Sequence, residues 1–523
     1  MTDTLIQTLK TSAAFPHPAE AIQVRETHIS WVLLTGDFAY KIKKPVDFGF
    51  LDYSSLDKRK HFLELEMQLN QRLAPELYLE VLPISGTSEA PRIGDASDPF
   101  EYTLKMRQFD DSQLLNALQQ RGELKEEHLL QLSDEIAEFH QQLAGHQPPD
   151  DLGTAEAIWA PAQQNFEQIR GLLDDEEALK QLKLLEDWSV DTFERLKDTF
   201  NQRHADGFVR ECHGDLHLGN ATLWQGKVVA FDCIEFNPGF RWCDVISDLA
   251  FLLMDLEDRG LKQLANITLN HYLEKTGDYE SLQLLCFYKV YRALVRAKIN
   301  LFRLGQPGLD DEDKAAVIRQ YRSYTDLAES YTDFNSPYLM ITYGVSGSGK
   351  STLTENIVRE LGGIRIRSDV ERKRLFGLDA QANSHSAVAS GIYTPEASEQ
   401  TYQRLSDLAD QVLRSCHPVT LDATNLKRAQ RDRLRDVAEN LGLPSLIIAL
   451  KADEATLRRR ITKRQQEGEK VAEADLAVLE QQLASREPLN EDELGCAVTV
   501  DTDAPAASQT LVKLIRDHLK LEG

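Results

Sequence analysis

The sequence lacks any long apolar segment. Its apolar runs, such as residues 250–254, are far shorter than the roughly 20 residues that a membrane-spanning helix needs. The first ten residues carry an acid early and have no long apolar core, so no secretory signal is expected. These two absences argue against a membrane protein and favour a cytoplasmic location.

Cysteine and positive charge are also scarce. The chain has six cysteines, scattered without the spacing of a disulfide framework, which favours reduced thiols. Acidic residues outnumber basic ones by 84 to 59, and the net charge is −25. We therefore expect neither a nucleic acid nor an anionic membrane as partner, because both bind positive protein surfaces.

With 523 residues, the chain is too long for one hydrophobic core, and two or three domains are expected. Hydrophobic residues make up 42% of it, so most of the chain should fold. The polar stretch at residues 331–337 contains a proline and predicts a hinge. We predict one domain at residues 1–333 and another at 337–523.

One polar stretch, CHGDLHLGN at residues 212–220, dominates the first domain. Asp215 and Asn220 are five residues apart, the spacing of the catalytic Asp and the metal-binding Asn in protein kinases. A short apolar run follows and ends at Asp232, where a kinase has a second metal-binding acid. Carboxylate and amide oxygens suit Mg²⁺. We predict that Asp215 accepts the substrate hydroxyl proton and that Asn220 and Asp232 hold Mg²⁺.

Two other interpretations of this stretch stay open. It could be a polar turn between strands without chemistry, although several spaced polar positions would then coincide by chance. Alternatively, Cys212, His213 and His217 could hold zinc, but no second Cys or His pair at zinc-finger spacing accompanies them.

The segment before this stretch predicts a sheet and a helix. Residues 27–35 and 38–42 form a predicted hairpin, and a lysine at the end of its second strand could neutralise ATP phosphates. We choose Lys41 for this role over its neighbours Lys43 and Lys44. On the helix predicted at residues 56–73, Glu66 is the expected partner of Lys41, with Glu64 as the alternative.

Residues 213–220 resemble the catalytic loop of the aminoglycoside phosphotransferase and choline kinase group. The resemblance implies a protein-kinase-like fold, with an N-lobe at about 20–108 and a helical C-lobe at about 109–333. It also implies that backbone groups at Met106 hold adenine and that Asp248 supports the catalytic loop. In one departure from kinases, no G-x-G-x-x-G joins the first two predicted strands, and Gly36 is the only glycine between them.

The second domain opens on a phosphate-binding motif. A predicted strand at residues 338–343 leads into GVSGSGKS, which satisfies G-x-x-x-x-G-K-[ST], and a predicted helix follows. The backbone amides and the helix N-terminus would hold phosphates, Lys350 would reach the β- and γ-phosphates, and Ser351 would bind Mg²⁺. The alternative is a Gly/Ser turn with a chance lysine. The predicted ATP-binding residues are Gly344, Ser346, Gly347, Ser348, Gly349, Lys350, Ser351 and Thr352.

Later residues resemble the gluconate kinase, polynucleotide kinase and zeta-toxin branch of P-loop kinases. In that branch an acid at the end of the second strand contacts the acceptor hydroxyl, so Asp369 is the candidate base, and a helix N-cap is the alternative. Asp422 ends a buried strand and resembles the acid that steers Mg²⁺. Arg460 and Arg464 resemble lid arginines, or they form a solvated basic face, and residues 467–475 would be the lid loop.

Nearly the whole chain resembles bacterial fusions of an aminoglycoside phosphotransferase-like domain with a P-loop domain. We therefore predict an α/β multidomain protein: a bilobal kinase-like fold, then a P-loop NTPase α/β/α domain with a parallel sheet. The predicted function is ATP- and Mg²⁺-dependent phosphorylation of small-molecule hydroxyl acceptors by both domains. Two alternatives remain, in which the P-loop domain is an ATP-dependent regulatory switch or a nucleic-acid end kinase.

Overall fold

The computed structural model describes residues 2–11, 14–19, 21–49, 51–149, 151–305, 308–333, 336–380, 391–467 and 475–521. Its contacts divide the chain into two compact units. Unit 1 comprises Met1–Arg259 and Phe287–Ala328, and unit 2 comprises Gly260–Cys286 and Glu329–Gly523. The segment Gly260–Cys286 thus belongs to the same unit as the C-terminal part of the chain, so each unit is built from two separate stretches of sequence.

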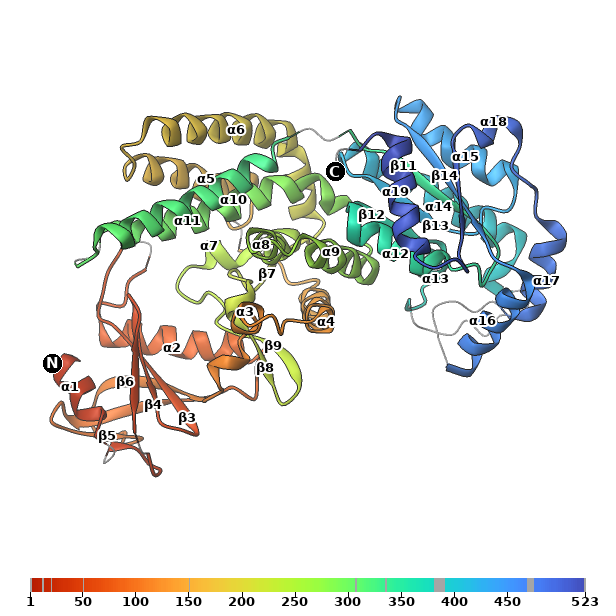
Figure 1. Ribbon diagram of the computed structural model, residues 1–523. Coiled ribbons are helices and arrows are strands. Elements are labelled where there is room, and N and C mark those ends of the chain that lie inside the picture. The colour runs from red at the N-terminus through yellow and green to blue at the C-terminus, as the bar shows by residue number, and fades with distance from the viewer. Residues whose placement is uncertain are drawn as a thin grey trace. The chain divides into compact units, whose positions relative to one another are not determined.

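Unit 1 begins with a six-stranded antiparallel sheet in the order β1-β2-β3-β6-β4-β5 (Figure 1). Alternation along β3 sends Tyr40 and Ile42 toward helix α1, while Lys41 and Lys43 face helix α2. The bounds are α1 Thr2–Leu9, β1 Gln23–Glu26, β2 Ser30–Leu34, β3 Phe38–Lys43, α2 Leu56–Asn70, β4 Tyr78–Thr87, β5 Ala90–Ile93 and β6 Pro99–Arg107.

Helices make up most of the rest of unit 1. Helix α6 (Glu176–Ala205) is capped at its N-terminus by Asp175, whose side chain accepts hydrogen bonds from the amides of Glu177 and Ala178. Helix α8 (Val245–Asp258) is buried along most of its length. The others are α3 Leu115–Gln120, α4 Glu126–Gln142, α5 Ala155–Arg170, α7 Pro238–Arg241, α10 Leu282–Leu301 (which begins in unit 2) and α11 Asp311–Ser330, and the short strands are β7 Val209–Glu211, β8 Ala221–Trp224, β9 Lys227–Ala230 and β10 Trp242–Asp244.

Unit 2 contains a five-stranded parallel sheet in the order β12-β13-β11-β14-β15 (Figure 1). Its central strands read as continuous apolar runs because helices cover both faces. The strands are β11 Leu339–Tyr343, β12 Ile364–Arg367, β13 Val419–Asp422, β14 Ser445–Lys451 and β15 Ala497–Asp501. The helices are α9 Lys262–Thr276, α12 Lys350–Leu361, α13 Ser368–Leu375, α14 Pro395–Arg414, α15 Arg428–Asn440, α16 Glu454–Glu467, α17 Leu476–Ser485, α18 Glu491–Leu494 and α19 Ala507–Leu519.

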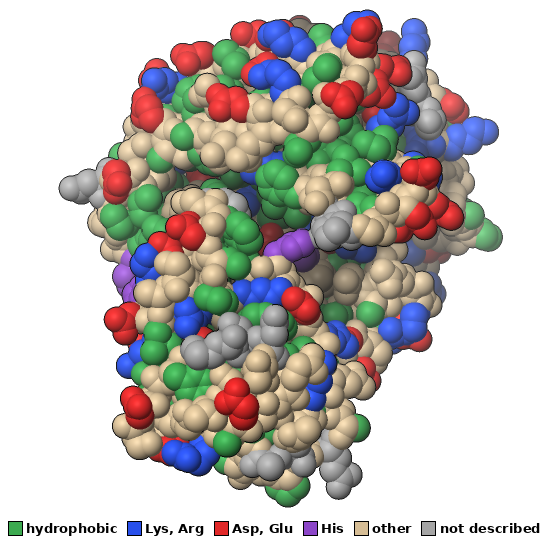
Figure 2. All heavy atoms as spheres, turned by 90° about the vertical axis from the view of Figure 1, so that its left-hand side faces the viewer, with side chains coloured by type: hydrophobic (Ala, Val, Ile, Leu, Met, Phe, Trp, Pro, Cys, Tyr) green, Lys and Arg blue, Asp and Glu red, His purple; other side chains and the backbone are tan. Residues whose placement is uncertain are grey.

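None of the helices in the described ranges is long and apolar enough to cross a bilayer. On the face drawn in Figure 2, the coloured Lys and Arg side chains are interspersed with Asp and Glu side chains. The described side chains of this face therefore form no continuous basic stripe of the kind that binds a nucleic-acid backbone.

Candidate active sites

In unit 1 the structure brings the predicted lysine and two predicted acids together. Lys41 Nζ lies 2.6 Å from Glu66 Oε1 and 3.1 Å from Asp232 Oδ1. Burial alone raises the pKa of the Glu66 carboxyl, but the two lysines beside it lower the pKa to about 2. Glu64, the alternative partner, instead lies 3.8 Å from Lys60 at the surface.

In the predicted catalytic loop, two side chains contact Asp215. Asn220 Nδ2 donates to Asp215 Oδ2 over 3.0 Å, and His217 Nε2 lies 3.5 Å from the same oxygen. Burial raises the pKa of the Asp215 carboxyl, but His217 and Arg296 outweigh burial and hold the pKa below its ordinary value. Asp215 is therefore ionised at neutral pH and can accept a hydrogen bond from a substrate hydroxyl.

The Asp248 side chain binds the backbone at the start of the predicted catalytic loop. Its carboxylate accepts the backbone amides of His213 and Gly214 at 3.0 and 2.9 Å. The zinc interpretation is not supported, because His213 Nε2 lies 2.8 Å from the Phe231 carbonyl and the Cys212 thiol donates to the Cys243 carbonyl. Among the described residues, a different set of side chains has its ligand atoms within 4.8 Å of one another, as a metal site would need. This set is His140, Cys212 and Asp248, all of which are buried.

The end of β6 leads to the predicted adenine-binding segment. Met106 pairs with Ala39 of β3 in the sheet. Directly after β6, Gln108 accepts the Gly36 amide and donates its own amide to the Asp37 carbonyl. The sequence prediction missed strand β1. The turn between the first two strands is therefore the one at residues 27–29, between β1 and β2, and it contains no glycine.

In unit 2 the P-loop curves tightly between β11 and α12. Gly347 and Gly349 have φ values of +80° and +87°, which favour glycine, and a Cβ at Gly347 would lie 3.0 Å from the Leu457 carbonyl. Lys350 Nζ donates to the carbonyls of Gly344 and Val345, at 3.1 and 2.9 Å. Burial lowers the pKa of Lys350. The loop thus has the backbone cradle that a phosphate chain requires.

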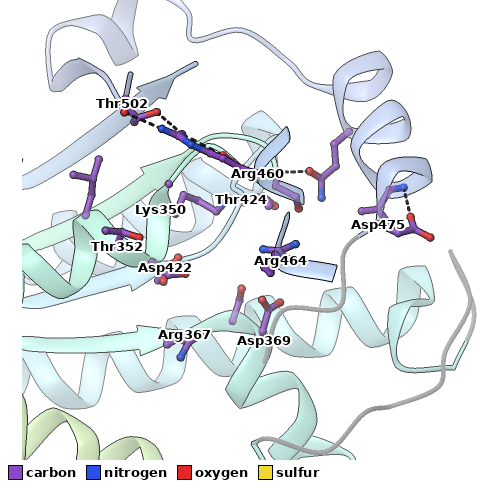
Figure 3. A pocket seen from close by; sticks show the side chains of 18 of the residues that line it. Lys350, Thr352, Arg367, Asp369, Asp422, Thr424, Arg460, Arg464, Asp475 and Thr502 are labelled. Atoms are coloured by element: carbon purple, nitrogen blue, oxygen red, sulfur yellow. Dashed lines mark hydrogen bonds between the residues drawn. The ribbon is translucent and has the colours of Figure 1, made fainter. Parts of the chain in front are cut away.

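A cavity of about 1050 Å³ opens in front of this loop (Figure 3). Asp422 lies between Lys350 and Arg367 in this view, and Asp369 lies near Arg464. The volume is at the upper end for a single small ligand. The predicted residues that line the cavity are Ser346, Gly347, Gly349, Lys350, Ser351, Thr352, Asp369, Asp422, Arg460 and Arg464, while Gly344 and Ser348 do not.

The donor groups in both units fit Mg²⁺. In unit 2 Asp422 is buried at the end of β13, where it accepts the Thr354 hydroxyl at 3.2 Å, and the Ser351 hydroxyl lines the same cavity. In unit 1 the Asp232 side chain is 45% exposed, and the residue before it, Phe231, donates its amide to the Asn220 carbonyl at 2.9 Å. Carboxylate, hydroxyl and amide oxygens are the hard ligands that Mg²⁺ prefers.

The two predicted lid arginines differ. Arg460 donates to the Gly347 carbonyl, to Thr502 and to Asp503, and so it braces the P-loop against the end of β15. Arg464 also lines the cavity and lies near Asp369 in the view of Figure 3. The centre of the predicted lid loop, residues 468–474, lies outside the described residues.

Two mycobacterial proteins match most of the chain. The “uncharacterized protein Rv2004c” of Mycobacterium tuberculosis is 31% identical over 404 residues, covering 77% of this chain and 78% of the relative. “Uncharacterized protein Mb2027c” of Mycobacterium bovis matches to the same extent. The chain belongs to the Rv2004c family. Within it, residues 339–489 match the family model described as “AAA domain”.

Solved structures resemble each half of this Rv2004c-family chain only distantly. A choline/ethanolamine kinase family protein from Mesorhizobium loti is 12% identical, with a TM-score of 0.39, over 63% of this chain and 97% of that one. A gluconokinase from Sinorhizobium meliloti is 23% identical, with a TM-score of 0.25, over 35% and 98%. The predicted second unit of the P-loop type is confirmed by the match at residues 339–489 and by its parallel sheet.

Sequence reasoning gave no role to two charged residues in unit 1 of this family member: it passed over Lys43 in favour of Lys41, and it did not consider Glu235. Buried Lys43 donates to Glu66 Oε2 at 2.8 Å and also contacts Glu235, which accepts the Tyr53 hydroxyl at 2.5 Å. Glu66 therefore holds two lysines. The i, i+2 spacing of Lys41 and Lys43 on one strand was the signal that could have found the second lysine.

In unit 2 the sequence prediction missed Arg367 and Arg372, which line the cavity on either side of Asp369 in the chain. Arg372 Nη1 donates to the Ile392 carbonyl at 2.9 Å, and its buried Nε has no hydrogen-bond partner among the described residues. Helix α13 begins at Ser368, so Asp369 lies inside its first turn and is not its N-cap. The N-cap alternative for Asp369 is therefore wrong.

Proposed function

We propose that the chain carries two ATP- and Mg²⁺-dependent phosphotransferases, each of which transfers the γ-phosphate of ATP to a hydroxyl of a small molecule. The observation that carries this proposal is the convergence of Lys41, Glu66 and Asp232 from three separate parts of the sequence. These ion pairs would supply a cation for the phosphates and an acid for the metal, and the ionised Asp215 would supply a base for the acceptor.

In unit 1 the acceptor hydroxyl would donate to Asp215 and face the γ-phosphorus in line. The bond from the acceptor oxygen to phosphorus forms as the bond from phosphorus to the β,γ-bridging oxygen breaks, and the hydroxyl proton passes to Asp215. Because the transition state is loose, this proton moves late, and a weakly basic carboxylate suffices. Mg²⁺ bound by Asn220 and Asp232 would neutralise the phosphate oxygens, and Lys41 would orient the ATP phosphates.

In unit 2 the corresponding roles fall to other elements. The P-loop amides and Lys350 would hold the β- and γ-phosphates, Ser351 and Asp422 would hold Mg²⁺, and Asp369 would accept the hydroxyl proton. ADP leaves with the bridging oxygen, as in unit 1. The cavity supports this proposal because its lining includes all four residues.

The test uses the full chain, γ-labelled ATP and a metabolite extract, with mass spectrometry to identify the labelled compounds. We expect two labelled products, one lost in Asp215→Ala and the other lost in Lys350→Ala. A single product that disappears in Asp215→Ala and only changes its rate in Lys350→Ala would support a regulatory P-loop unit instead. Label on an added 5′-hydroxyl oligonucleotide that depends on Lys350 would support an end kinase.

A further inference from the structure

Helix α9 closes the open edge of the parallel sheet in unit 2. β12 is an edge strand, and such strands expose unpaired amides and carbonyls. The buried Asn270 side chain bonds to both kinds of group, because its Nδ2 donates to the Gly363 carbonyl at 2.9 Å and its Oδ1 accepts the Arg365 amide at 2.7 Å. One side-chain amide thus takes the place of a neighbouring strand.

One turn further along α9, Glu274 forms ion pairs with two arginines of β12. Glu274 Oε1 lies 2.9 Å from Arg367 Nη1, and Oε2 lies 3.4 Å from Arg365 Nη2. The Glu274 carbonyl also accepts Arg374 Nη2 of α13 at 2.5 Å. The arginine side chains of both ion pairs are 13% exposed, so water screens these charges only weakly.

Only one of these two arginines reaches the cavity. Arg367 is the last residue of β12 and lines the cavity, whereas Arg365 does not line it and bonds to the Ser351 carbonyl. In the sheet Arg367 pairs with Asp422, and Asp369 follows it by two residues. In the view of Figure 3, Arg367 lies below Asp422 and to the left of Asp369.

We infer that Glu274 is a positioning residue of the P-loop site, which holds the Arg367 guanidinium away from closed ion pairs with Asp369 and Asp422. This inference rests on the proposed function of unit 2. A long arginine beside two carboxylates would otherwise neutralise the candidate base or the metal-binding acid. Glu274 binds one end of the guanidinium, which keeps the two acids available for the acceptor and for Mg²⁺.

The experiment uses the full chain with Asp215→Ala, so that only unit 2 turns over ATP. Mg²⁺-ATP is the probe, and turnover is measured with and without the metabolite extract, beside ATP affinity by calorimetry. In Glu274→Gln we expect kcat to fall at least tenfold while the affinity for ATP stays within threefold. The matched control is Glu280→Gln in the same segment, which should stay within twofold, because Glu280 does not line the cavity.

A double-mutant cycle with Arg367→Gln tests whether Glu274 acts through Arg367. We expect kcat of the double variant to fall no further than in the worse of the two single variants, because both changes remove the same Glu274–Arg367 ion pair. Multiplying losses would overturn the inference, as would full turnover in Glu274→Gln. If the parent chain shows no turnover that depends on Lys350, the proposed function itself fails, which is a different result.

Folding is checked by circular dichroism, and Glu274→Asp serves as a second variant. Aspartate keeps the charge but shortens the reach by one methylene, so we expect it to recover part of the kcat lost in Glu274→Gln. If neither variant folds, Glu274 is a structural residue only and the positioning role is overturned.

Discussion

In unit 1 the candidate phosphate-binding lysine already has two carboxylate partners, whereas in unit 2 Lys350 donates to two carbonyls of its own loop. Burial lowers the pKa of both ammonium groups, but only at Lys41 do Asp232 and Glu66 raise the pKa well above its ordinary value. Unit 1 therefore neutralises its charges internally. Unit 2 holds a lysine whose charge the triphosphate itself would compensate.

The two candidate bases differ in the same way. Asp215 is held by Asn220 and His217, whereas the Asp369 carboxylate accepts no hydrogen bond from the described residues. Order in the first site thus comes from neighbouring side chains. In the second site it comes from the backbone of the P-loop and from the helix that closes the sheet edge. The following changes test this contrast, from the largest expected effect to the smallest.

Replacing Asp215 with alanine should have the largest effect on unit 1. We expect transfer to its acceptor to fall by about 10²–10⁴-fold, the usual contribution of a positioned base. ATP affinity should stay nearly constant, because Lys41 and the predicted metal ligands Asn220 and Asp232 remain. Steady-state kinetics and calorimetry measure the two quantities, and unchanged turnover would remove Asp215 from its assigned role.

Asp369→Asn tests the candidate base whose carboxylate accepts no hydrogen bond from the described side chains. Transfer in unit 2 should fall by at least ~10²-fold, while ATP affinity changes less than about threefold, which is under ~1 kcal/mol. Unit 1 transfer serves as the internal control. If transfer in unit 2 persists and unit 1 rates now respond differently to ATP, the P-loop unit is a switch and the comparison of two catalytic sites breaks.

Asn270→Ala tests how far unit 2 depends on α9. The change leaves a backbone carbonyl and an amide of β12 unpaired, and we expect it to lower the free energy of unfolding of unit 2 by about 1–3 kcal/mol. In thermal unfolding, the transition of unit 2 is identified as the one whose shift on addition of Mg²⁺-ATP is lost in Lys350→Ala. Gln263→Ala on the same helix removes only an exposed hydrogen bond, and an equal loss there would contradict the special role of Asn270.

Glu135→Gln should make unit 1 less sensitive to pH. Burial raises the pKa of Glu135 on α4 to about 8, from an ordinary value of 4.5. Between these two values the unfolded chain loses its proton first, so the native state becomes less stable as pH rises from 4.5 to 8. The variant should therefore unfold at a higher temperature than the parent at pH 8 and at nearly the same temperature at pH 4.5. Glu138→Gln, an exposed change on the same helix, should leave the slope intact.

The sequence allowed prediction of features that depend on neighbours in the chain. The P-loop, the Asp215–Asn220 spacing and the parallel sheet of the second domain could be predicted, because each of these motifs directly follows or precedes a strand in the sequence. Strand β1 was missed because Gln23–Glu26 is polar and shows no alternation. Glu235 and Glu274 were missed because each acts on a residue far away in the sequence, and no local pattern encodes such a pairing. The assigned roles of the site residues stay predictions.

The interleaving of the two units also bears on how the protein is made. Asn270 and its partner Gly363 are 93 residues apart. At a synthesis rate of about 5–20 residues per second, α9 leaves the ribosome roughly 5–20 s before the strand it closes. During that interval the side chain of Asn270 has no β12 strand to bond to, because the rest of unit 1 is synthesised first. A gene cut between the two motifs would therefore release a P-loop fragment whose sheet edge has lost its cover.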